Sequence, residues 1–136
     1  MVVVDTNVIS ELMKRVAHPA VLAWAADQAG EVRTTSMTVA EIRWGVARLP
    51  AGRRRDELQA RADELLADEE RALPFDLAAA RRYPDVLRRR ADAGAPVATA
   101  DAIIASVCLA RGATLATRNV DDFEHVGLTV VNPWGP

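Results

Sequence analysis

Three acidic side chains in this sequence each stand alone beside an apolar segment: Asp5, Glu41 and Asp101. Asp5 directly follows three valines that predict a buried strand, and Glu41 and Asp101 lie near the starts of predicted helices. A fourth acidic position falls within residues 119–122, which read Asn-Val-Asp-Asp. Because loops at the carboxyl ends of parallel strands collect ligand sites, we expect these acids to converge.

Converging carboxylates have a specific chemical use, which is to hold a hard divalent cation such as Mg²⁺. This ion prefers oxygen ligands, keeps several of its waters and binds through a few carboxylates together with substrate phosphate. A bound ion acidifies a water molecule and stabilises negative charge on phosphorus oxygens. The pattern therefore predicts a site for the hydrolysis of phosphodiesters.

Each acid also has a purely structural interpretation. Asp5 could cap the helix that follows the first strand, and Glu41 could complete a capping box with Thr38. Asp101 could simply interact with a helix dipole. Taken singly, these interpretations compete evenly with a metal site, but they do not explain all three acids together.

The apolar spacing predicts alternating strands and helices, which is typical of a parallel sheet covered by helices. We expect one α/β domain spanning residues 1–136. Pro84 is expected to kink or divide the helix that contains it. The predicted strands are 2–4, 32–35, 114–117 and 128–131, and the predicted helices are 19–29, 38–49, 53–72, 76–92 and 99–111, with a further helix after Asp5.

The formal net charge of -2 provides no overall attraction to nucleic acid, so a polyanionic partner requires local basic patches. Of the 17 basic residues, all but Lys14 are arginines, whose planar guanidinium group suits phosphate. They cluster at 53–55, 81–82 and 88–90. These clusters are either phosphate-binding patches or solvated helix faces.

The remaining composition predicts a soluble, cytoplasmic protein that does not enter membranes. No apolar stretch approaches the roughly 20 residues that span a bilayer. The single cysteine, Cys108, lies in an apolar run and is expected to be a buried, inert thiol.

Four segments resemble, in order, the motifs of PIN-domain proteins, particularly VapC-like toxins of bacterial toxin-antitoxin modules. They are residues 2–11, 38–45, 99–105 and 115–123, and the closing Val-Asn-Pro-Trp of 131–134 resembles one branch of these toxins. The resemblance implies a PIN-like three-layer α/β sandwich with a mostly parallel central sheet. It also implies a Mg²⁺- or Mn²⁺-dependent endoribonuclease that cleaves RNA, forms a homodimer and is inhibited by a cognate antitoxin inserting a segment near the active site.

The resemblance also implies roles for individual residues. Asp5, Glu41 and Asp101 would be the metal-centred acids, and the supporting polar groups would be Thr6, Asn7 and Thr117. The position two residues after Thr117, often aspartate in relatives, is Asn119 here, which could ligate through its carbonyl oxygen. Asp122 is favoured over Asp121 as the alternative source of charge. With only three strong acids, a second ion is expected to bind only when RNA phosphate completes its coordination.

Two other functions are compatible with parts of this pattern. One is a catalytically weak PIN-like binding module that works with its antitoxin in transcriptional autoregulation. The other is an aspartyl-nucleophile phosphotransferase, which also begins with a strand ending in aspartate. That class needs a downstream lysine, and the only lysine here is Lys14.

Overall fold

The chain forms five short strands and six α-helices in the computed structural model, which describes residues 1–135. The strands are β1 (Val2–Val4), β2 (Val32–Thr35), β3 (Ala72–Leu73), β4 (Thr114–Ala116) and β5 (Val130–Val131). The helices are α1 (Thr6–Leu12), α2 (Pro19–Asp27), α3 (Ser36–Ala47), α4 (Arg53–Leu65), α5 (Leu77–Asp92) and α6 (Thr99–Arg111). Two 3-10 turns, η1 (Glu69–Arg71) and η2 (Val120–Phe123), complete the chain.

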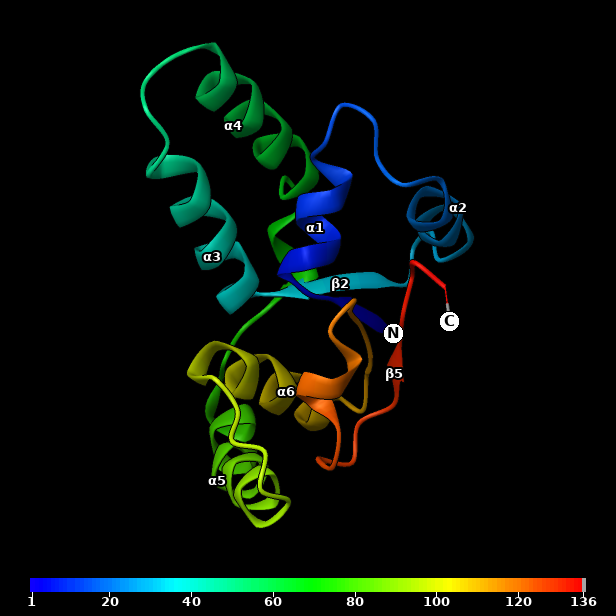
Figure 1. Ribbon diagram of the computed structural model, residues 1–136, viewed down its shortest axis with the longest axis vertical. Coiled ribbons are helices and arrows are strands. Elements are labelled where there is room, and N and C mark those ends of the chain that lie inside the picture. The colour runs from blue at the N-terminus through cyan, green and yellow to red at the C-terminus, as the bar shows by residue number, and fades with distance from the viewer. Residues whose placement is uncertain (136) are drawn as a thin grey trace.

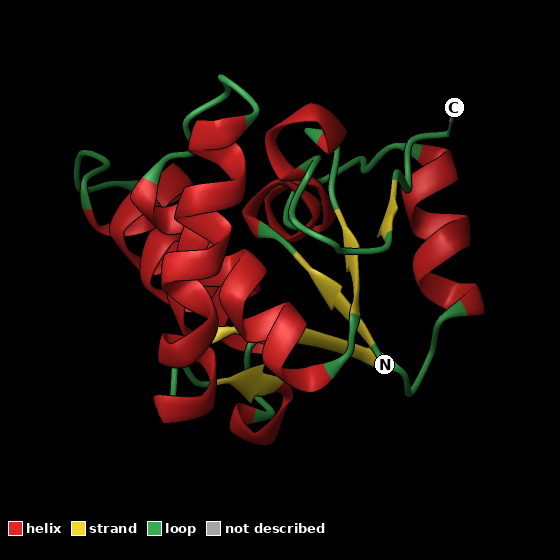
Figure 2. Cartoon of the chain, turned by 90° about the horizontal axis from the view of Figure 1, so that it is seen from below, coloured by secondary structure: helices red, strands yellow, loops and turns green. Residues whose placement is uncertain are grey.

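The strands form one parallel sheet in the order β3-β2-β1-β4-β5. Successive side chains of a strand point to opposite faces, so Val3 packs against α5 and α6, whereas Val4 packs against α1 to α4. Figure 1 shows α1 to α4 on one side of the sheet and α5 and α6 on the other. Figure 2 shows the strands fanning out between these helices, as the twist of a sheet requires. The predicted three-layer α/β sandwich is therefore confirmed.

The start of α3 differs from the prediction in a way that matters for the site. The helix begins at Ser36, and its N-cap is Thr35, whose hydroxyl accepts a hydrogen bond from the Thr38 backbone N–H at 3.0 Å. The predicted capping box of Thr38 and Glu41 is therefore wrong. Because Glu41 lies in the second turn of the helix, its carboxylate is available for another role.

The elements between residues 53 and 92 also differ from the sequence prediction. Helix α4 ends at Leu65, not at residue 72, and the chain then forms η1 and the unpredicted strand β3. A strand of two residues is too short for a recognisable pattern. Helix α5 continues through Pro84 without being divided, because its apolar stripe packs along α6.

Other local predictions are confirmed. Asp76 caps α5 by accepting a hydrogen bond from the Ala79 backbone N–H at 3.0 Å. Gly112 ends α6 in the left-handed conformation, with φ of 61°. None of the helices within residues 1–135 is long and apolar enough to cross a membrane.

Candidate active site

Asp5 lies where the strand order of the sheet reverses, between β1 and β4. Its backbone N–H donates to the Ala116 carbonyl at 3.1 Å. One carboxylate oxygen accepts from the Val8 backbone N–H at 3.2 Å and so caps α1, and the other accepts from the Thr117 hydroxyl. Asp5 is therefore both a helix cap and a fixed carboxylate at the position where open parallel sheets bind ligands.

Glu41 is brought to the same place by a contact between two helices. Its carboxylate, half-buried on α3, accepts a hydrogen bond of 2.7 Å from the hydroxyl of Thr6 at the start of α1. Thr6 directly follows Asp5, so this bond holds Glu41 beside the end of β1. The supporting role predicted for Thr6 has a physical basis in this contact.

Asp101, in the first turn of α6, is the acid most affected by its neighbours. Burial raises its pKa to about 6, and the charges of Asp122, Glu41 and Asp5 contribute in that order. Burial also raises the pKa of Asp5, with a smaller contribution from Glu41. Asp101 therefore lies within electrostatic reach of the other three carboxylates, and Asp5 lies within reach of Glu41. We call these four carboxylates the acid cluster.

The choice among the acids of residues 119–122 is informed by these charges. Among the charged groups that raise the pKa of Asp101, Asp122 has the largest effect, and Asp121 is not one of the main ones. Asn119 is exposed, and its backbone N–H donates to the Thr117 hydroxyl at 3.0 Å. The backbone N–H of Asn7 favours the ionised form of Asp5 and so lowers its pKa. Asp122 is thus better placed than Asp121 to act with the acid cluster.

The acid cluster is not a ready-made set of metal ligands. Across residues 1–135, no three His, Cys, Asp or Glu side chains lie close enough together to hold one ion jointly. The repulsion that raises the pKa of Asp101 also favours separation of the carboxylates. Asp5 is fixed by two hydrogen-bond donors, so binding of an ion would require the half-buried Asp101 and Glu41, or the exposed Asp122, to turn towards it.

Arg90 is a site residue that sequence reasoning missed. It is only 6% exposed, and its guanidinium donates to the backbone carbonyls of Asp121 at 2.9 Å and Glu124 at 3.2 Å. It thereby holds the η2 segment that carries Asp122, and its charge lowers the pKa of Asp101. Neither interpretation of the 88–90 cluster, a phosphate patch or a solvated face, holds for Arg90. The available signal was its helical spacing from the buried residues Ala79 and Val86.

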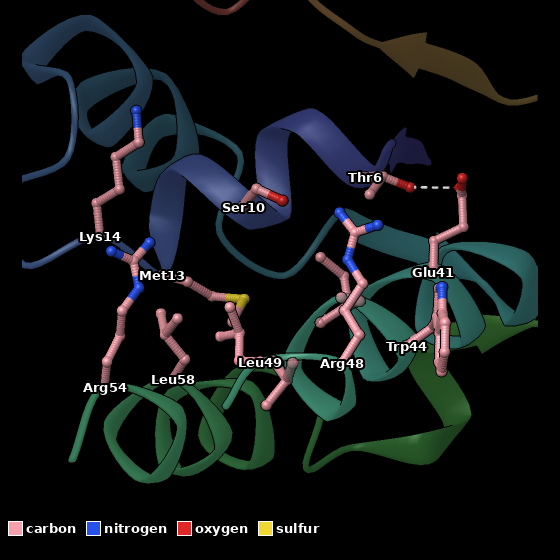
Figure 3. Close-up of a pocket in the computed structure, with 13 residues that line it drawn as sticks. Thr6, Ser10, Met13, Lys14, Glu41, Trp44, Arg48, Leu49, Arg54 and Leu58 are labelled. Atoms are coloured by element: carbon pink, nitrogen blue, oxygen red, sulfur yellow. Dashed lines mark hydrogen bonds between the residues drawn. The ribbon is translucent and has the colours of Figure 1, made fainter. Parts of the chain in front are cut away.

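A groove of about 570 Å³ runs from the acid cluster between α1, α3 and α4. Figure 3 shows Thr6 and Glu41 at one end of this groove and Lys14 and Arg54 at the other. Its lining is largely apolar, and Trp44, at 65% exposure, lies beside Glu41. The apolar residues that line it are Met13, Ile42, Val46, Leu49 and Leu58. A chain segment bound in the groove would reach Glu41.

The sequence and the fold both match known proteins. Residues 2–128 match the family model of the PIN domain. VapC ribonuclease Y4jK of Sinorhizobium fredii is 45% identical over 139 residues, covering 100% of this chain and 99% of the relative. Toxin FitB of Neisseria gonorrhoeae is 34% identical, covering 98% and 99% of the two chains. A solved structure of FitAB bound to an IR36 DNA fragment gives a TM-score of 0.91 at 34% identity, covering 100% of this chain and 97% of that one.

Proposed function

Because the chain belongs to the PIN-domain family, we propose that it is the toxin of a toxin-antitoxin pair and hydrolyses RNA phosphodiester bonds at the acid cluster. The observation that carries this proposal is the hydrogen bond from the Thr117 hydroxyl to the Asp5 carboxylate. It links the ends of β1 and β4 and fixes Asp5 near Glu41 and Asp101. The ribonuclease name of the relative from S. fredii, which matches the whole of this chain, supports the same activity.

The chemistry of the acid cluster fits a divalent cation, although its geometry requires adjustment. All candidate donors are oxygens, which suits Mg²⁺ or Mn²⁺ better than softer metals. Asp5, Asp101 and Glu41 would hold the ion, and Asp122 or the Asn119 carbonyl oxygen would complete the set. When bound, the ion would supply Lewis-acid stabilisation of the phosphodiester and lower the pKa of a water molecule.

The chain's own residues prepare this site before substrate arrives. Thr117 and the Val8 N–H fix both oxygens of Asp5, and Thr6 orients Glu41. Such fixed positions limit the reorganisation needed during the reaction. The carboxylates of the acid cluster repel one another and concentrate negative charge, which favours a cation and opposes RNA in the absence of one.

The phosphotransferase alternative is disfavoured by two contacts. Lys14 donates to the Glu11 carboxylate at 3.1 Å, so the only lysine is engaged elsewhere. Both oxygens of Asp5 accept hydrogen bonds, which reduces their nucleophilicity. A binding role with the antitoxin is compatible with ribonuclease activity, and the DNA-bound FitAB structure supports considering it as a second function.

We also place the antitoxin contact in the groove between α1, α3 and α4. The groove has a largely apolar lining, with Lys14 and Arg54 at one end and Glu41 at the other. A bound segment with apolar side chains would therefore cover one side of the acid cluster and block RNA. Co-expression of the chain with its cognate antitoxin should quench or shift the fluorescence of the exposed Trp44, and Trp44→Phe should remove that change.

The central test is cleavage of a mixed RNA pool in the presence of Mg²⁺, Mn²⁺ or a chelator. We expect cleavage with either metal and none with the chelator. Asp5→Asn should abolish cleavage, whereas Asp121→Asn, a change of the same type at an exposed neighbouring acid, should preserve it. Cleavage that persists in Asp5→Asn or in the chelator would contradict the assignment.

A further inference from the structure

A more polar hollow of about 440 Å³ also lies against α1, and it shares Ser10 and Lys14 with the groove between α1, α3 and α4. It is formed by α1 and the segment that follows β4, together with the chain near residue 134. We call it the Arg118 hollow. The residues that line it are Asn7, Ser10, Glu11, Lys14, Arg118, Asn119 and Trp134. Asn7 and Asn119 lie close in sequence to Asp5 and Thr117, so the hollow adjoins the acid cluster.

Arg118 contributes a fixed and available positive charge to this hollow. It directly follows Thr117, the residue bonded to Asp5, and its guanidinium carbon lies 5.2 Å from the centre of the Trp134 ring. The side chain is exposed, and among residues 1–135 no carboxylate pairs with it within 4 Å. Stacking on an aromatic face holds a guanidinium without neutralising its charge.

Trp134 is itself held in place by Asn132, two residues before it, and by Glu11 of α1. Its backbone N–H donates to the Asn132 side-chain carbonyl at 2.9 Å, and its side chain is one of the donors that lower the pKa of Glu11. Glu11 is only 7% exposed, and its carboxylate accepts a hydrogen bond of 3.1 Å from Lys14, the main cause of its lowered pKa. The negative charge of Glu11 is therefore matched by Lys14, which leaves the hollow with the net positive charge of Arg118.

We propose that the Arg118 hollow binds a phosphate of the RNA strand next to the bond being cleaved, with Arg118, supported by Trp134, as its main contact. This inference rests on the proposed ribonuclease function. The acid cluster repels a polyanion, so RNA needs a nearby cation to hold it in register. The planar fork of arginine matches phosphate oxygens. The Trp134 face is covered by Arg118, so its part is to position the guanidinium rather than to stack on a base.

The test measures RNA affinity separately from cleavage. A short fluorescein-labelled single-stranded RNA of mixed sequence is titrated, at several salt concentrations, into protein carrying Asp5→Asn. Adding Arg118→Ala should raise Kd about tenfold, which is about 1.4 kcal/mol. It should also lower the slope of log Kd against log salt by about 0.7, the value for one phosphate contact on a single strand. In protein with Asp5 intact, KM should rise more than kcat falls.

Three further variants separate charge from position. Arg118→Lys should keep the salt slope but lose part of the affinity, because lysine lacks the planar fork. Trp134→Leu should also keep the salt slope and lose part of the affinity, because the charge of Arg118 remains but the aromatic ring that positions its guanidinium is removed. Arg82→Ala removes an exposed arginine from α5, on the opposite face of the sheet, and should leave Kd and the salt slope unchanged.

The outcomes distinguish this inference from the proposed function. Unchanged Kd and salt slope in Arg118→Ala, with RNA cleavage intact, would overturn the phosphate site alone. Equal losses in Arg82→Ala would also overturn it, because they would indicate diffuse attraction rather than a site. Failure of the wild-type protein to cleave RNA with Mg²⁺ or Mn²⁺ would overturn the proposed function, and this inference with it.

Discussion

Replacing Asp101 with asparagine should stabilise the protein while abolishing its activity. The carboxyl group of Asp101 has its pKa raised from 3.8 to about 6 by burial and by three neighbouring carboxylates. Its ionised form is therefore less favourable in the folded chain than in the unfolded one. Asparagine has a similar shape and no charge, so it removes this penalty along with a proposed metal ligand.

The size of the effect follows from the pKa. A rise of this extent corresponds to about 3 kcal/mol between the two protonation states. Solvent screens part of it, because Asp101 is only half-buried. The substitution also loses an interaction of about 0.3–1 kcal/mol with the N-terminus of α6. We therefore expect Asp101→Asn to raise the free energy of unfolding by about 1 kcal/mol at neutral pH.

The direction of the pH dependence is fixed by the sign of the pKa change. Below the unfolded pKa of Asp101 the carboxyl group is protonated in both states and costs nothing, and the full cost appears as the pH rises above about 6. The gain from Asp101→Asn should therefore be nearly absent at about pH 3 and complete at about pH 7.5.

Urea unfolding in a chelator at both pH values measures this gain. Asp121→Asn is the matched control and should change stability little at either pH, because Asp121 is exposed and is not among the main charges that raise the pKa of Asp101. A mutant no more stable than wild type at neutral pH, or one equally stabilised at both pH values, would refute the reasoning. RNA cleavage by Asp101→Asn would refute its catalytic part.

Three other predictions concern residues outside the acid cluster. Arg90→Met should lower the free energy of unfolding by about 2–3 kcal/mol and reduce cleavage, because two carbonyls of the η2 segment lose their donor; a loss below about 1 kcal/mol in urea would contradict this. Gly45→Ala should raise the free energy of unfolding by about 0.5–1 kcal/mol, because an added Cβ in α3 meets nothing within 4 Å. Because Gly45 lines the groove, the same change should weaken antitoxin binding measured by calorimetry. A less stable variant would be evidence against the stability prediction. Cys108, whose pKa burial raises to about 12, should react with Ellman's reagent at about pH 8 only in denaturant, and rapid reaction of the native protein would show the thiol to be accessible.

Structural features that depend only on residues close together in the chain could be predicted from the sequence. The valines of β1, the Asp76 cap and the left-handed Gly112 each follow from a short pattern, and the structure contains all three. The candidate acids could also be selected, because isolated carboxylates beside apolar segments are uncommon. Their metal-binding roles rest on the resemblance to PIN-domain proteins and stay a prediction.

Local patterns were misleading where two arrangements satisfy the same rule. Thr35 and Thr38 both suit an N-cap, and only the pairing of β2 with its neighbours ends the strand at Thr35. Pro84 favours a break, but packing along α6 outweighs the loss of one backbone hydrogen bond. In both cases a tertiary contact decided between nearly equal local alternatives.

The sequence alone determined which residues could do chemistry, because side-chain type and short-range spacing are local properties. Only the tertiary structure decided which of them meet. The Thr117 hydroxyl reaches Asp5 across 112 positions of the chain because β1 and β4 are adjacent in the sheet. Arg90, which belongs to an apparently solvated arginine run, turns inward to hold the η2 segment, because that position of α5 faces the core. Contacts of this kind depend on how strands and helices pack, so a short sequence pattern can indicate that a position is buried but not which residues it meets.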